Sequence, residues 1–121
     1  MFDRFVRKDI EAEINWLDRS VFHLDGPQAL RHLDTLLAMP RVHAIQWVPG
    51  ANSGPAMQWV PILRRIQAAG RAIHMTVEPD EVLPLLGALD PRGILLQTRV
   101  DSEDEADALV AQVARLEVPA R

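Results

Sequence analysis

The sequence predicts an α/β fold in which one helix is followed by four strand–helix units with parallel strands. Four apolar runs, each too short for a helix, recur along the chain and end at turns or polar loops. Each run is followed by apolar residues at helical spacing. The runs are continuously apolar rather than alternating, which is typical of parallel strands covered by helices.

The N-terminal part of the chain predicts a helix, a strand and a second helix. Residues 3–18 predict a helix, because six apolar side chains lie on one helical stripe: Phe2, Phe5, Val6, Ile10, Ile14 and Leu17. Residues 20–25 form an apolar run that stops at Gly26-Pro27 and predict a buried strand. Proline suits the first turn of a helix, and the helical spacing that begins there continues to Pro40.

The same order then recurs in the middle of the chain. Residues 42–48 predict a strand, residues 49–55 a loop, and residues 56–69 a helix that Gly70 ends. Pro61 lies inside this helical pattern, so the first turn is expected to be separate or the helix to begin near it.

The last two units follow the same pattern. Residues 72–77 predict the third strand, and Pro79 begins the helix after it. Residues 94–98 predict the fourth strand. The acidic segment 101–105 then provides the negative charge that a helix N-terminus favours, ahead of an apolar helical stripe.

Length and composition favour one globular domain over residues 1–121. The chain has no cysteine, so disulfides, thiolate zinc sites and cysteine nucleophiles are excluded. Its net charge is −4 and its basic residues are spread along the chain, so nucleic acid is not expected as a partner. No signal peptide or bilayer-spanning apolar run is present, so we expect a cytoplasmic protein that does not bind a membrane.

Polar side chains mark the end of every predicted strand. Ligands of parallel α/β proteins bind beyond the C-terminal ends of the strands, so we expect a site for a small molecule there. The candidate residues are His23 and Asp25 on the first strand, Gln46 and Trp47 on the second, His74 and Glu78 at the third, and Gln97 and Arg99 at the fourth.

His23 and Asp25 are the candidate catalytic residues. A strand's period of two places both on one side, where they can act as an acid/base pair or as two ligands of a divalent metal. The structural alternative is that Asp25 caps the helix begun at Pro27 while His23 is a hydrogen-bonded core residue. His32 and His43, on a helix and at a strand start, are expected to be structural.

The candidate substrate-binding residues carry alternatives of the same kind. Glu78 either holds a ligand or favours the positive end of the following helix. Arg99 either clamps a carboxylate or phosphate group, or pairs with the acidic segment 101–105. Trp47 adjoins the glycine-containing loop 49–55, where it either faces an organic ligand or packs in the core. That loop has no phosphate-binding motif.

Five segments of the sequence carry a resemblance to a known family, and the resemblance covers about residues 3–116 in one register. They are FHLDGPQALRHLD (22–34), HAIQWVPGAN (43–52), IQAAG (66–70), EPDEV (78–82) and GILLQTRVDSEDEADALV (93–110). The segments resemble the C-terminal half of uroporphyrinogen-decarboxylase-like proteins, a superfamily that includes the cobalamin-linked methyltransferases. The resemblance implies half of a TIM-type (β/α)8 barrel and an enzyme, or enzyme part, with decarboxylase (lyase) or methyltransferase chemistry on a small organic substrate.

The resemblance also bears on cofactors. In the methyltransferase branch a His-x-Cys motif at a strand end supplies two zinc ligands. The matching stretch here is His23-Leu24-Asp25, so His23 is retained and Asp25 stands where the cysteine would be. A divalent metal held by His23, Asp25 and Glu78 is therefore the cofactor that the resemblance leaves open.

Members of the superfamily are complete eight-stranded barrels, whereas this chain provides four strands. An open parallel sheet leaves two exposed edges and an uncovered inner face, so we expect a covering partner. The partner is expected to be a second copy of the chain, in a barrel-like or domain-swapped homo-oligomer, or a complementary N-terminal half-barrel.

Two functional hypotheses make different structural predictions. The hypothesis that the chain is an enzyme or enzyme part predicts one pocket that holds His23, Asp25 and Glu78. A non-catalytic binding or assembly module predicts that these residues are dispersed or occupied in helix caps and ion pairs.

Overall fold

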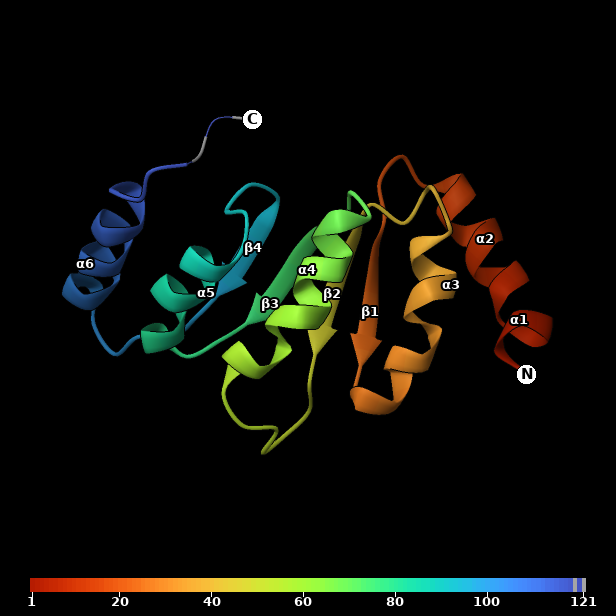
Figure 1. Cartoon of the computed structure of the whole chain (residues 1–121), viewed down its shortest axis with the longest axis horizontal. Coiled ribbons are helices and arrows are strands. Elements are labelled where there is room, and N and C mark those ends of the chain that lie inside the picture. Colours follow the sequence, from red (N-terminus) through yellow and green to blue (C-terminus); the bar gives the residue numbers. More distant parts are fainter. Residues whose placement is uncertain (119, 121) are drawn as a thin grey trace.

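The computed structural model describes residues 1–118 and 120, and it has the expected α/β architecture. Four parallel strands form one sheet in the order β1-β2-β3-β4, and helices connect them (Figure 1). The strands are β1 Val21–Asp25, β2 Ala44–Val48, β3 Ala72–Thr76 and β4 Ile94–Gln97. Each lies within its predicted range, because the apolar runs and the turns that end them are local signals.

The helices mostly follow the predicted segments. They are α1 Phe2–Phe5, α2 Arg7–Trp16, α3 Leu33–Leu37, α4 Val60–Ala68, α5 Val82–Ala88 and α6 Glu103–Ala114. Short 3-10 helices, Pro27–His32, Ala56–Trp59 and Pro79–Glu81, precede α3, α4 and α5.

Two of the helical predictions can be compared in detail. Pro61 lies in the first turn of α4, which confirms that the turn before it is separate. The continuous helix over residues 3–18 is wrong, since Val6 interrupts it with a φ of −106° and divides it into α1 and α2.

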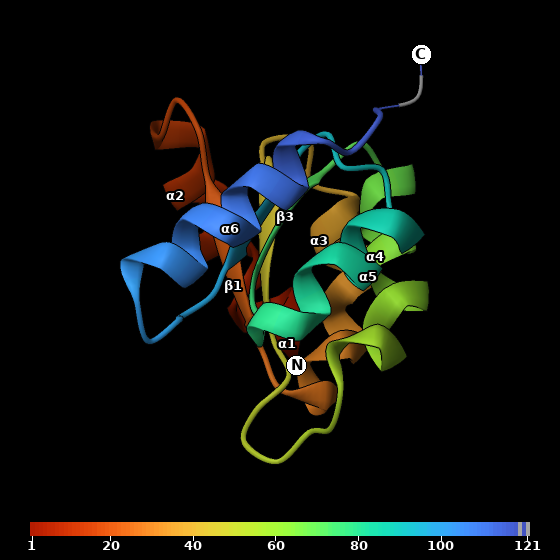
Figure 2. The ribbon, with the colours of Figure 1, turned by 90° about the vertical axis from the view of Figure 1, so that its left-hand side faces the viewer.

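The hydrophobic core lies on one side of the sheet. Helices α3, α4 and α5 cover this face, while α2 lies at the β1 end of the sheet and α6 at the β4 end (Figures 1 and 2). Alternate strand residues point into the core, among them Leu24, Ile45 and Ile73, each at most 2% exposed. No helix in the described part of the chain is long and apolar enough to cross a bilayer.

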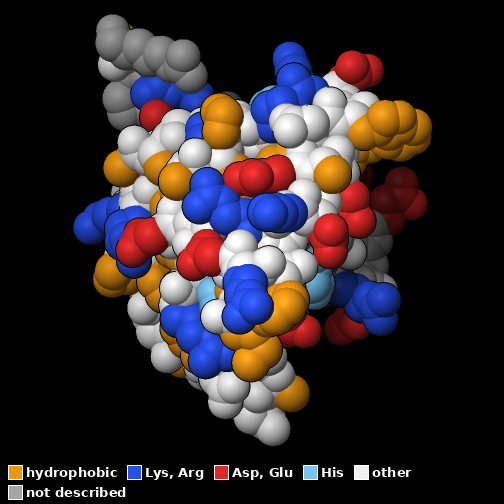
Figure 3. Space-filling model, turned by 90° about the vertical axis from the view of Figure 1, so that its right-hand side faces the viewer, with side chains coloured by type: hydrophobic (Ala, Val, Ile, Leu, Met, Phe, Trp, Pro, Cys, Tyr) orange, Lys and Arg blue, Asp and Glu red, His pale blue; other side chains and the backbone are white. Residues whose placement is uncertain are grey.

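The other face of the sheet carries no helix, and we call it the open face. Its side chains come from the remaining strand positions: Val21, His23, Asp25, Ala44, Gln46, Val48, Ala72, His74, Thr76, Leu95 and Gln97. All of these are exposed or half-buried. Hydrophobic side chains are also exposed among charged ones at the β1 end of the molecule (Figure 3).

Candidate functional site

Three of the predicted site residues lie side by side on the open face. The strand register pairs His23 of β1 with Gln46 of β2, and Gln46 with His74 of β3. We call these three residues the polar row. All three point away from the helices, because the buried positions of each strand are the ones before and after them. The strand register thus places these three candidate residues side by side.

The polar row contains a direct hydrogen bond. His23 Nδ1 lies 2.7 Å from Gln46 Oε1. An amide oxygen can only accept a hydrogen bond, so Nδ1 carries the proton and donates it. The neutral imidazole then has an unprotonated Nε2 that can take up a proton. The hydrogen bond with Gln46 thus fixes the orientation of the His23 ring and leaves Nε2 on its far side.

Asp25 lies on the same strand, beyond His23. Its Oδ2 is 4.0 Å from His23 Nε2, at the limit of an ion-pair distance. The two side chains are 57% and 67% exposed, so water weakens their attraction. The structural alternatives for both residues are wrong: His23 is not in the core, and the N-cap before Pro27 is Gly26, with no side-chain cap bond.

The end of β4 adds two further candidates near the open face. Gln97 pairs in register with Thr76 of β3 and is exposed. Arg99 follows two residues later and is also exposed. Among the described residues Arg99 forms no ion pair, so its predicted alternative, pairing with the acidic segment 101–105, is not seen. Its guanidinium is available to an anionic group.

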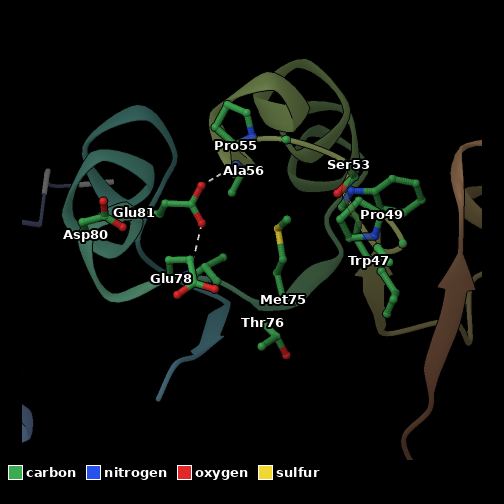
Figure 4. Close-up of a pocket in the computed structure, with 15 residues that line it drawn as sticks. Trp47, Pro49, Ser53, Pro55, Ala56, Met75, Thr76, Glu78, Asp80 and Glu81 are labelled. Atoms are coloured by element: carbon green, nitrogen blue, oxygen red, sulfur yellow. Dashed lines mark hydrogen bonds between the residues drawn. The ribbon is translucent and has the colours of Figure 1, made fainter. Parts of the chain in front are cut away.

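A separate cavity of about 710 Å³ lies at the ends of β2 and β3, between loop 49–55 and the Glu78–Glu81 turn (Figure 4). Trp47 and Glu78 line it. Trp47 is fully buried on the helix-covered side of the sheet, where its ring packs edge-on against Trp59 at 5.1 Å. It is therefore a wall of this cavity and a core residue, and it does not share the open face with Gln46.

Glu81 holds the two sides of this cavity together. Its Oε1 accepts a hydrogen bond from the Ala56 N–H at 2.6 Å, and its Oε2 accepts one from the Glu78 N–H at 3.0 Å (Figure 4). The candidate residues did not include Glu81. The signal that points to it is the spacing Glu78-x-x-Glu81, since a glutamate three residues after an N-cap reaches back to the N-cap N–H.

The three residues predicted to hold a metal ion do not share one pocket. His23 and Asp25 lie on β1, whereas Glu78 follows β3 and lines the cavity. Two strand spacings, about 10 Å, separate β1 from β3. In residues 1–118 and 120, no three His, Asp or Glu side chains are placed to hold a metal ion. His23, Asp25 and Glu78 are therefore not placed to bind one metal ion together.

The two remaining histidines make contacts within the fold. The His32 ring stacks on Phe2 with a centroid separation of 4.1 Å. His43 Nδ1 accepts a hydrogen bond from the Ser20 N–H at 3.1 Å. Neither ring lies in the polar row, so both can serve as internal references for His23 and His74.

Comparison with known proteins assigns no family to the chain. No family model, no curated protein and no solved structure matches it.

Proposed function

We propose that the chain is an enzyme part whose open face binds a small organic carboxylic acid, with His23 as the group that transfers a proton. The hydrogen bond between His23 Nδ1 and Gln46 Oε1 is the observation that carries this proposal. It gives one exposed imidazole a defined orientation and leaves its Nε2 free to react. Arg99, at the end of β4, is the cation proposed to hold a carboxylate.

The proposal includes the wider architecture. The four strand–helix units are taken as half of an eight-stranded barrel, with the open face turned toward its interior. Sequential strand order and helices on one face of the sheet support this assignment. The resemblance to uroporphyrinogen-decarboxylase-like proteins is part of the same proposal, and a second chain is needed to enclose the open face.

A decarboxylation is the reaction that this arrangement suits best. The bond between the carboxyl carbon and its neighbour breaks, carbon dioxide leaves, and the electron pair stays on the substrate carbon. The His23 imidazolium then donates its Nε2 proton to that carbon and recovers a proton from water. Asp25 Oδ2 lies 4.0 Å from Nε2, beside the proton that is transferred. The substrate must carry a group that accepts the electron pair.

One observation favours the second candidate, a binding module without catalysis. Glu78 is the N-cap residue of the 3-10 helix Pro79–Glu81 and lies away from His23. This separation removes one of the three residues that the enzyme hypothesis placed together. In the binding module, His23 and Arg99 would hold the same carboxylate without transferring a proton.

The binding step can be tested by nuclear magnetic resonance with succinate as the probe. The four imidazoles are observed by long-range ¹H–¹⁵N correlation at a pH of about 6.5, the pKa of histidine in model peptides. Succinate is expected to shift the signals of His23 and His74 and to leave those of His32 and His43 in place. Replacing Arg99 with glutamine should weaken the effect.

Succinamide is the matched control, since it has the same length but no charge, and it should shift none of the four signals. Equal shifts at all four histidines, or no shift at His23 with succinate at high millimolar concentration, would contradict the proposal. Catalysis is then separated from binding by following carbon dioxide release from a panel of β-keto acids by wild-type and His23→Gln proteins. Equal rates would leave only the binding module.

A further inference from the structure

The exposed hydrophobic side chains of the molecule gather at the two ends of the sheet. Among the described residues, every exposed large hydrophobic side chain except Met57 lies at one end or the other. The β1 end, which includes α1 and α2, has Met1, Phe5, Val6, Trp16, Leu17 and Val21, and the β4 end, which includes α6, has Leu95, Val110 and Val118. Exposed hydrophobic side chains that are scattered singly over a surface are normal, whereas hydrophobic patches at two opposite ends of a molecule indicate interaction sites.

The β4 end contains a groove, and the β1 end contains a side chain of a size to fill it. The groove, of about 400 Å³, lies between α5, β4 and α6 and has only apolar lining residues: Val82, Leu86, Pro91, Ile94, Leu95, Leu96, Val113, Leu116 and Val118. Trp16, the last residue of α2, is 85% exposed. The C-terminal ends of α2 and α6 both lie at the edge of the sheet where the strands begin (Figure 1). Trp16 ends α2, and Val113, Leu116 and Val118 of the groove lie at or beyond the end of α6.

Charges match at the opposite edge, where the strands end. The first part of α6 carries Glu103, Asp104, Glu105 and Asp107, and none of these forms an ion pair within the described residues. The first turns of α1 and α2 carry Arg4, Arg7 and Lys8 together with the acids Asp3 and Asp9, and Arg7 is already paired with Glu11 at 2.8 Å. Arg4 and Lys8 form no ion pair within the described residues. Helices α1 and α6 begin at this edge, which is the lower one in Figure 1. A second chain in the same orientation would set basic residues beside acidic ones.

We propose that the β4 end of one copy binds the β1 end of a second copy, head to tail, and that two such junctions close a dimer. Within residues 1–118 and 120, no strand pairs with the outer edge of β1 or of β4, and the two strands run in the same direction, so a parallel pairing across the junction continues the sheet. Trp16 of the second copy fills the apolar groove, and α2 of that copy packs along α6. This inference rests on the proposed function, because it names the chain that encloses the open face.

The junction also completes the site. It brings β1 of the second copy, with His23 and Asp25 on its open face, next to β4, whose open face carries Gln97. The carboxylate-binding Arg99 of one copy then lies beside the proton-transferring His23 of the other. A single chain separates these two residues by the full width of its sheet.

Sedimentation velocity and native mass spectrometry test the interface. The wild-type chain is expected at twice the 13.6 kDa mass of one chain. Removing a buried tryptophan anchor typically weakens an interface by about thirtyfold or more, so Trp16→Ala should raise the dissociation constant by at least that factor. Val118→Glu, in the groove, should do the same, whereas Met57→Ala, away from both ends, should leave it unchanged.

Mixing the two weakened variants distinguishes a head-to-tail contact from a symmetric one. A mixed dimer of Trp16→Ala and Val118→Glu chains has one junction with both side chains intact, so it should be tighter than either variant alone. Dimers that Val118→Glu does not weaken, or variants that gain nothing from mixing, would overturn the head-to-tail arrangement. A wild-type chain that stays at 13.6 kDa at high micromolar concentration would overturn the dimer itself.

Recording the succinate titration on the same samples separates this inference from the proposed function. A monomer whose His23 responds to succinate contradicts the dimer but leaves His23 as the binding group of the proposed function. A head-to-tail dimer whose His23 does not respond contradicts only the proposed function.

Discussion

Replacing Glu81 with alanine is expected to destabilise the protein by about 2–4 kcal/mol, although no apolar core side chain changes. The Glu81 carboxylate accepts two backbone hydrogen bonds, from Ala56 at 2.6 Å and from Glu78 at 3.0 Å. Ala56 is only 4% exposed, so water cannot readily replace its lost acceptor, and a bond of this kind contributes about 1.5–3 kcal/mol. Glu78 is exposed, so its bond contributes about 0.5–1 kcal/mol.

Urea unfolding followed by tryptophan fluorescence measures this loss of stability. Glu81→Gln keeps one acceptor oxygen and should lose about half as much. Asp80→Ala is the matched control, because it removes a neighbouring exposed carboxylate, and it should stay within about 0.5 kcal/mol of wild type. Hydrogen exchange of the Ala56 amide should accelerate in Glu81→Ala but not in Asp80→Ala. If Glu81→Ala is no less stable than Asp80→Ala, Glu81 does not hold the two loops together.

Three further substitutions test the core, the polar row and one turn. Gln46→Leu should remove the preference of neutral His23 for the Nδ1-protonated tautomer, which ¹⁵N chemical shifts report; an unchanged tautomer would refute the orienting role of Gln46. Trp47→Ala should lower the free energy of unfolding in urea by about 3–5 kcal/mol, because the ring is fully buried. The control Met57→Ala should lower it by less than about 0.5 kcal/mol, and equal losses would contradict the burial of Trp47. Gly26→Ala should cost about 1–3 kcal/mol, since φ +80° and ψ 155° suit glycine alone, and a neutral result would exclude this backbone conformation.

The strands and their order along the chain could be predicted because their signals are local. Each strand is a short apolar run, and proline or glycine ends most of them. Pro61 marked the separate turn before α4 for the same reason. The break in the first helix at Val6 could not be predicted, since neither glycine nor proline occurs there.

The site could be predicted as a set of strand-end residues but not as a geometry. Which residue lies beside His23 depends on the register between strands, and the register depends on loop conformations that no short motif fixes. The separation of Gln46 and Trp47 could have been predicted. Gln46 and Trp47 are adjacent on β2, so a strand's period of two already excludes both from the same face.

Glu81 and the metal site illustrate a further limit. A carboxylate that bonds the backbone of another loop gives no sequence signal for that contact, although the spacing from Glu78 indicates its local bond. A metal site of His23, Asp25 and Glu78 requires the ends of β1 and β3 to lie close together, although β2 lies between them. The sheet keeps β1 and β3 two strand spacings apart, so Glu78 lines a different cavity.

A crystal structure of the chain grown with succinate tests most directly whether the open face is the functional face. We expect a second chain to enclose that face, with a succinate carboxylate within hydrogen-bond distance of His23 Nε2 or of the Arg99 guanidinium. An open face that is exposed to solvent, or a succinate bound only in the cavity beside Glu81, would contradict this expectation.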